Sequence, residues 1–154
     1  MNMKPICGWA AVLLAGMMCG GVQAAEEAKR QCEPVWEKGW IRLPPAPMAM
    51  LGGFGHIRNK CDQPMAIVSV SSPLFSDVSL HETRLVDGVS QMREVERLPV
   101  SPGRSVQLQP GGLHLMLMEP TKVLEENEVV PISLTLEDGR TIHGQLRVRK
   151  TAPR

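Results

Sequence analysis

The amino-acid sequence predicts an all-β domain, built as a sandwich or barrel, on three observations. Short stretches of strand-forming residues recur along the chain. Turn-forming pairs such as Asp87-Gly88 and Asp138-Gly139 separate them, in a chain with 13 prolines and 14 glycines. No segment carries a long helical repeat of apolar residues. Many short strands with frequent turns are typical of such β folds.

The elements follow from the amino terminus. Lys4, the apolar run 6–19 and the small residues Val22 and Ala24 predict a secretory signal peptide over residues 1–24, cleaved after Ala24 and leading to the periplasm. The apolar run is too short for a membrane span. Attachment of a lipid at Cys19 is disfavoured because residues 16–18 are not all small.

One domain is expected over residues 39–150, after a lead segment at 25–38 and before a short tail at 151–154. One helical turn could form at 122–128. The expected strands are, in order, Trp40–Leu43, Leu51–Arg58, Ala66–Ser71, Val78–Val86, Val89–Val95, Ser105–Gln109, Leu113–Met118, Pro131–Leu136 and Thr141–Lys150.

The charge balance excludes partners that a strong overall field would attract. Residues 1–24 hold one lysine and no acidic residue, so the rest of the chain has 16 basic and 16 acidic residues. We therefore expect neither nucleic-acid binding nor attraction to an anionic membrane, and the shortness of the apolar run argues against stable insertion into membranes. The chain is expected to act as a monomer.

Two cysteines remain after the signal peptide, Cys32 and Cys61. In an oxidising compartment an even pair predicts a disulfide, which would tie the lead segment to the domain. A thiolate metal site is the alternative, but no CxxC or CxxH spacing supports it.

The segment 113–118 alternates leucine with residues that bind soft metals. In a strand the leucines would enter the core, and His114, Met116 and Met118 would share the other face. Methionine also fills gaps in ordinary packing, so this strand alone leaves the metal interpretation open.

A second group of candidate ligands lies in the hairpin around Asp87-Gly88. A two-residue turn there pairs Thr83 with Met92 and His81 with Glu94. His81 and Met92 are then diagonal neighbours on one face, within reach of a shared ion. Glu94 could orient the His81 imidazole, or could be a solvated charge.

Together the two segments supply two imidazoles and at least two thioethers. These neutral, soft ligands favour a single Cu(I) ion over zinc, magnesium or calcium. A blue-copper electron-transfer centre would need a thiolate, and no cysteine is near either segment. Storage or transfer of copper therefore fits better than electron transfer.

The order His81, ten residues, Met92, twenty-one residues, His114, one residue, Met116 resembles the H-x10-M-x21-H-x-M signature of the PCu(A)C periplasmic copper chaperones. The flanking residues 71–73, 80–83 and 110–118 are similar too. The resemblance covers roughly residues 39–148.

This resemblance implies a cupredoxin-like Greek-key β-sandwich or barrel that binds one Cu(I) with His81, Met92, His114 and Met116. It also implies copper delivery to the CuA centre in subunit II of cytochrome c oxidase, directly or through a Sco-type protein. Some relatives carry a tail rich in histidine and methionine; this chain has none after residue 150, so a second, Cu(II) site is not supported.

Other candidates are weaker. Met118 could replace or shield Met116, and Met48 and Met50 could cover the site, although ordinary packing explains them as well. His56 and His143 stand alone. No GxSxG, HExxH, Cys/His or phosphate-loop motif is present, so no enzyme activity is expected. Copper sequestration and a metal-free β-sandwich interaction module remain alternatives to the chaperone.

Overall fold

The computed structural model describes residues 32–153, and ten strands found there join one hydrogen-bonded sheet. The described residues form no helix, which confirms the all-β prediction. Along the sheet the order is β5-β4-β8-β2-β1-β10-β9-β3-β6, and β7 also pairs with β2. The strands are β1 (Val35–Arg42), β2 (Met50–Arg58), β3 (Met65–Ser71), β4 (Phe75–Val86), β5 (Val89–Glu94), β6 (Leu98–Val100), β7 (Ser105–Leu108), β8 (Leu113–Pro120), β9 (Val129–Leu136) and β10 (Thr141–Arg149).

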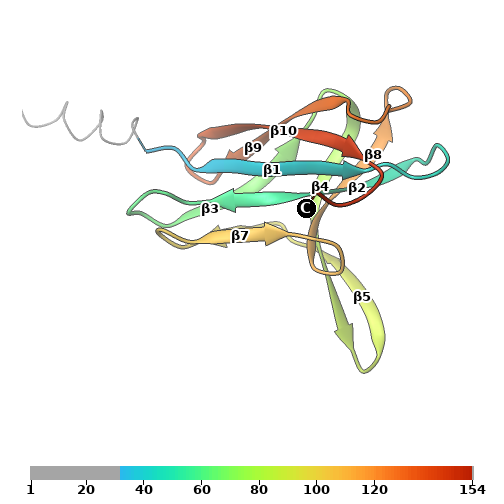
Figure 1. The fold of residues 1–154 in the computed structure, drawn as a ribbon. Coiled ribbons are helices and arrows are strands. Elements are labelled where there is room, and N and C mark those ends of the chain that lie inside the picture. Colours follow the sequence, from blue (N-terminus) through green and yellow to red (C-terminus); the bar gives the residue numbers. More distant parts are fainter. Residues whose placement is uncertain (1–31, 154) are drawn as a thin grey trace, which may run out of the picture. The chain divides into compact units, whose positions relative to one another are not determined.

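The sheet folds back on itself around one apolar core (Figure 1). Leu115 and Leu117 of β8 meet Leu134 of β9 and Leu146 of β10 in this core, and all four are completely buried. Strand β3 also contacts β4, which brings distant parts of the strand order together. The tip of the β4–β5 hairpin projects away from the other strands.

Most of the expected strands form, with differences at several boundaries. Strand β1 begins at Val35, before the expected Trp40, and β4 begins at Phe75 instead of Val78. Strand β6 was not expected, because it has three residues with a proline in the middle. The expected helical turn at 122–128 is absent; the Glu128 amide instead donates to the Glu125 carbonyl in a simple turn.

Trp36 explains why β1 starts before the predicted strand. Its indole is buried, and its Nε1–H donates to the Gln145 carbonyl at 3.0 Å. A side-chain carbon added at Gly39, Gly55 or Gly144 would come within 2.5 Å of an atom of this indole. The three glycines therefore form a slot for Trp36, which makes a residue of the expected lead segment part of the packed sheet.

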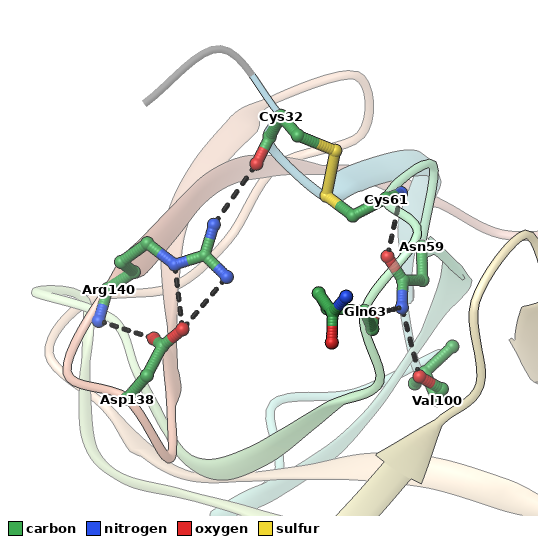
Figure 2. Close-up of a disulfide and its surroundings, with 7 residues drawn as sticks. All are labelled: Cys32, Asn59, Cys61, Gln63, Val100, Asp138 and Arg140. Atoms are coloured by element: carbon green, nitrogen blue, oxygen red, sulfur yellow. Dashed lines mark hydrogen bonds and ion pairs between the residues drawn. A yellow bond between two sulfur atoms is a disulfide. The ribbon is translucent and has the colours of Figure 1, made fainter. Parts of the chain in front are cut away.

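A disulfide joins Cys32 to Cys61, as predicted (Figure 2). The buried Asn59 stabilises this end of the sheet: its side-chain amide donates to the carbonyls of Gln63 and Val100, and its oxygen accepts from the Cys61 amide. Arg140 donates to the Cys32 carbonyl at 3.0 Å. The covalent bond and these hydrogen bonds together attach the start of the described chain to the sheet.

We expect the Cys32→Ser/Cys61→Ser double variant to unfold more easily than the wild type. The disulfide closes a loop of 29 residues, and losing such a closure costs about 3 kcal/mol of unfolding free energy. Urea titration followed by circular dichroism measures the change. Dithiothreitol should lower the stability of the wild type to that of the variant and leave the variant unaffected; equal stability of both proteins without reductant would contradict the prediction.

Candidate metal-binding site

The strand register gathers the expected soft ligands on the outer face of β5, β4, β8 and β2, the face turned away from the core. His81 of β4 is the direct cross-strand partner of His114 of β8. Direct partners point to the same side of a sheet. Their neighbours Leu80 and Leu115 are buried in the core on the other side. The two imidazoles therefore lie next to each other outside the core.

The β4–β5 hairpin has the predicted register. Val86 pairs with Val89, Thr83 with Met92, and His81 with Glu94. Asp87 and Gly88 both have positive φ, 51° and 80°, as a two-residue type I′ turn requires. Because Asp87-Gly88 sets this register, Met92 shares the outer face with His81.

The other two expected ligands lie one step to either side of the histidine pair. Met92 is the partner of Thr83, two residues beyond His81 along β4. Met116 is the partner of Ser79, two residues before His81. Cross-strand neighbours and their diagonals are within reach of long side chains. The structure thus brings together all four residues of the expected site on one face.

The imidazole rings are placed to hold one ion between them. Their centres are 6.1 Å apart and their planes differ by 34°. An imidazole nitrogen binds a metal at about 2 Å, so both rings can reach an ion at a point between the strands. His114 Nδ1 lies 2.9 Å from the Gly112 carbonyl oxygen, which can only accept a hydrogen bond. Nδ1 of His114 therefore carries the proton in the neutral ring, and the Nε2 lone pair is available to a metal.

The hydrogen bond of the His81 ring goes to a serine of its own strand. His81 Nε2 lies 3.0 Å from the Ser79 hydroxyl oxygen. Among the hydrogen bonds of the described residues, none joins the Glu94 carboxylate to this ring, although Glu94 is the cross-strand partner of His81. Ser79 orients the imidazole, and a rotating hydroxyl can give way when the nitrogen takes another partner.

Met116 lies between two small residues, and an aromatic ring covers one of them. Its partners are Ser79 on β4 and Gly52 on β2. A side-chain carbon at Gly52 would lie 3.0 Å from the tip of the Phe54 ring, so that ring leans over the glycine. Phe54 contacts Trp40 with ring centres 4.7 Å apart, and the Arg42 guanidinium lies over both rings. This aromatic pair borders the site on its β2 side.

The hairpin that carries Met92 is held by ion pairs on its opposite face. Glu82 accepts from Arg84 at 2.8 Å and from Arg93 at 2.9 Å. Two hydrogen bonds hold the pKa of Glu82 below its ordinary value; the bond from Arg84 has the larger effect and the bond from Arg93 the next. The Glu82 carboxylate therefore stays charged and keeps linking the two strands of the hairpin.

Sequence reasoning missed Ser79, Gly52 and Gly112. Ser79 shares a face with His81 by simple alternation, so its position could have indicated it. Gly112 acts through its carbonyl, which accepts from both the Thr83 amide and the His114 ring. That role depends on the path of the turn before β8, and no side chain signals it.

The remaining candidates lie apart from this group or beside it. His143 Nδ1 lies 3.2 Å from the Ser133 hydroxyl oxygen on β9, and His56 pairs across strands with Glu37 and Gln107. Within residues 32–153, no group of three or more His, Cys, Asp or Glu could hold a metal, so the candidate site depends on thioethers. No helix of the described chain is long and apolar enough to cross a membrane.

Known proteins resemble this chain over most of its length. A family model described as "Putative lipoprotein LpqE-like" matches residues 35–148. The chain belongs to the LpqE-like family. It is 32% identical over 107 residues to "Putative lipoprotein Lxx21020" of Leifsonia xyli subsp. xyli (strain CTCB07), covering 68% of this chain and 62% of that protein. The LpqE-like chain thus spans about three fifths of the length of this relative.

These lipoprotein descriptions indicate that the LpqE-like protein lies outside the cytoplasm, in agreement with the expected secretion signal. The expected cleavage after Ala24 and the disfavoured lipid at Cys19 both fall outside the described residues.

Solved structures confirm the cupredoxin-like fold and the resemblance to PCu(A)C proteins. The solution structure of CuI-DR1885 from Deinococcus radiodurans is 31% identical with a TM-score of 0.62, over 83% of this chain and 87% of that chain. The copper-bound PCuAC domain from PmoF2 is 20% identical with a TM-score of 0.61, over 75% of this chain and 92% of that domain. The LpqE-like chain therefore has the fold of copper-binding PCuAC domains.

The hydrogen bond to Gly112 predicts the tautomer of His114 in the metal-free protein. Nitrogen-15 NMR of the neutral imidazole should show a protonated Nδ1 and an unprotonated Nε2. His143 is the matched comparison, because its Nδ1 faces a serine hydroxyl that can donate or accept and so imposes no tautomer. A His114 ring protonated mainly at Nε2 would contradict the prediction.

Proposed function

We propose that this protein is an extracytoplasmic copper chaperone that carries one Cu(I) ion. The imidazoles of His81 and His114 and the thioethers of Met92 and Met116 hold the ion. One observation carries the proposal: the two histidines are direct cross-strand partners, and a methionine lies on the same face one step to either side.

The chemistry of these ligands selects the ion. Two neutral imidazoles and two thioethers favour the soft Cu(I) ion over hard cations. Thioethers need no deprotonation, so sulfur ligation does not depend on pH. Both cysteines of the described chain are joined in the disulfide and supply no thiolate. The ligand set therefore suits carriage of copper better than electron transfer.

Relatives support copper as the cargo. DR1885, 31% identical to this chain, is known in a Cu(I)-loaded form, and the PCuAC domain from PmoF2 in a copper-bound form. The disulfide supports an oxidising compartment such as the periplasm.

The proposal also includes delivery of the bound ion to a recipient protein. The site is on the outer surface, and 51% of Met92 is exposed, so a recipient could take the ion from the solvent side. We propose the CuA centre in subunit II of cytochrome c oxidase as the destination, reached directly or through a Sco-type protein. This recipient rests on the resemblance to PCu(A)C chaperones.

Anaerobic titration with Cu(I) against a competing chelator tests the site. The wild type should bind one equivalent tightly, and His81→Ala or Met116→Ala should weaken that binding. Loss of a group that merely supports a ligand costs about 10–100-fold in affinity, so loss of a ligand should cost at least as much. His143→Ala is the control, since this histidine also faces a serine but has no methionine neighbour. Equal affinity of the wild type and the His81 and Met116 variants would refute the assignment.

A deletion strain tests delivery separately. If the protein delivers copper, oxidase activity should fall at low copper and recover when copper is added. Copper sensitivity with normal oxidase activity would instead indicate sequestration. The deletion strain does not test which residues bind copper; the titration tests that.

A further inference from the structure

One step beyond Met116, two more methionines face each other on the outer face. Met118 of β8 is the direct cross-strand partner of Met50 of β2. Met50 is 43% exposed, and Met118 is partly buried. The four-ligand site uses neither of them, and their neighbours Leu51 and Leu117 supply the core packing. Both thioethers are therefore free to bind a ligand at the surface.

The register puts the two sulfur atoms within reach of one ion. Direct partners in an antiparallel pair have Cβ atoms about 4.5–5.5 Å apart, and methionine side chains are long and flexible. Asp77 of β4 is the partner of Met118 on its other side. Two thioethers beside a carboxylate favour a soft cation over a neutral or anionic ligand.

The pair is also placed to communicate with the histidine site. Met116 lies two residues before Met118 on the same face, a separation of about 7 Å along a strand. Met116 lies between Ser79 and Gly52, and Ser79 is two residues before His81 on the same face. A continuous line of soft ligands therefore crosses the outer face. It begins at the Met50–Met118 pair, continues through Met116 and ends at the His114–His81 pair.

We propose that Met50 and Met118 form a second, weaker Cu(I) site from which the ion passes through Met116 to the histidines. This inference rests on the proposed function for its destination, while the site itself rests on the methionine pair. In the transfer, a bond from copper to the Met50 or Met118 sulfur breaks as a bond to Met116 or an imidazole nitrogen forms. Copper stays Cu(I) throughout, and no electron or proton needs to move.

Silver(I), a soft monovalent ion that is stable in air, tests the proposal in chloride-free buffer. In protein labelled with carbon-13 at the methionine methyl groups, the first equivalent should shift the Met92 and Met116 signals. A second, weaker equivalent should then shift those of Met50 and Met118. Met50→Leu and Met118→Leu keep the size of the side chain and remove the sulfur; each should weaken the second event by about tenfold or more and preserve the first.

Met48→Leu is the matched control, because Met48 is exposed in the loop before β2 and pairs with no strand. It should preserve both binding events. Stationary Met50 and Met118 signals at excess silver, or loss of the second event in Met48→Leu, would overturn the second site. Stationary Met92 and Met116 signals would instead refute the proposed function, so the two failures are distinguishable.

Discussion

The burial of the leucines of β8 is the constraint on which the candidate site depends. Leu115 and Leu117 are completely buried between the two sides of the folded sheet. Because side chains alternate along a strand, their burial forces His114, Met116 and Met118 onto the outer face. A slip of one residue would bury the histidine and expose the leucines. The free energy lost by exposing their apolar surface to water keeps the register unique.

The hairpin adds ligands to this face by a different mechanism. Strand β5 is exposed along its whole length and, among the strands of the described chain, pairs with β4 alone, so core burial contributes little to its position. The register of the β4–β5 hairpin comes from the Asp87-Gly88 turn, and the ion pair between Glu82 and Arg93 links its two strands. The candidate site therefore combines three of the proposed ligands on well-packed strands with one on an edge strand held by local interactions.

Much of this arrangement could be predicted from the sequence, because alternation and turn chemistry are local. The register of the hairpin and the separation of leucines from ligands in β8 needed no knowledge of distant residues. The direct pairing of His81 with His114 could not be predicted locally, because it depends on which strands become neighbours in the sheet. The early start of β1 was hidden for a similar reason: Trp36 fits a slot made by glycines from three strands. The short β6 has too few residues to give a pattern, and the carbonyl of Gly112 has no signature in the sequence.

The edge position of β5 has a consequence for the rate at which the proposed copper site would exchange its ion. Bending the β4–β5 hairpin would withdraw Met92 and leave the two imidazoles and Met116 in place, because those residues lie on strands fixed by the core. An incoming sulfur or nitrogen from an acceptor could then occupy the vacated position before any other bond breaks. The barrier to such a dissociative exchange would be set by the stiffness of the hairpin, so the residence time of the ion would depend on residues that do not touch it.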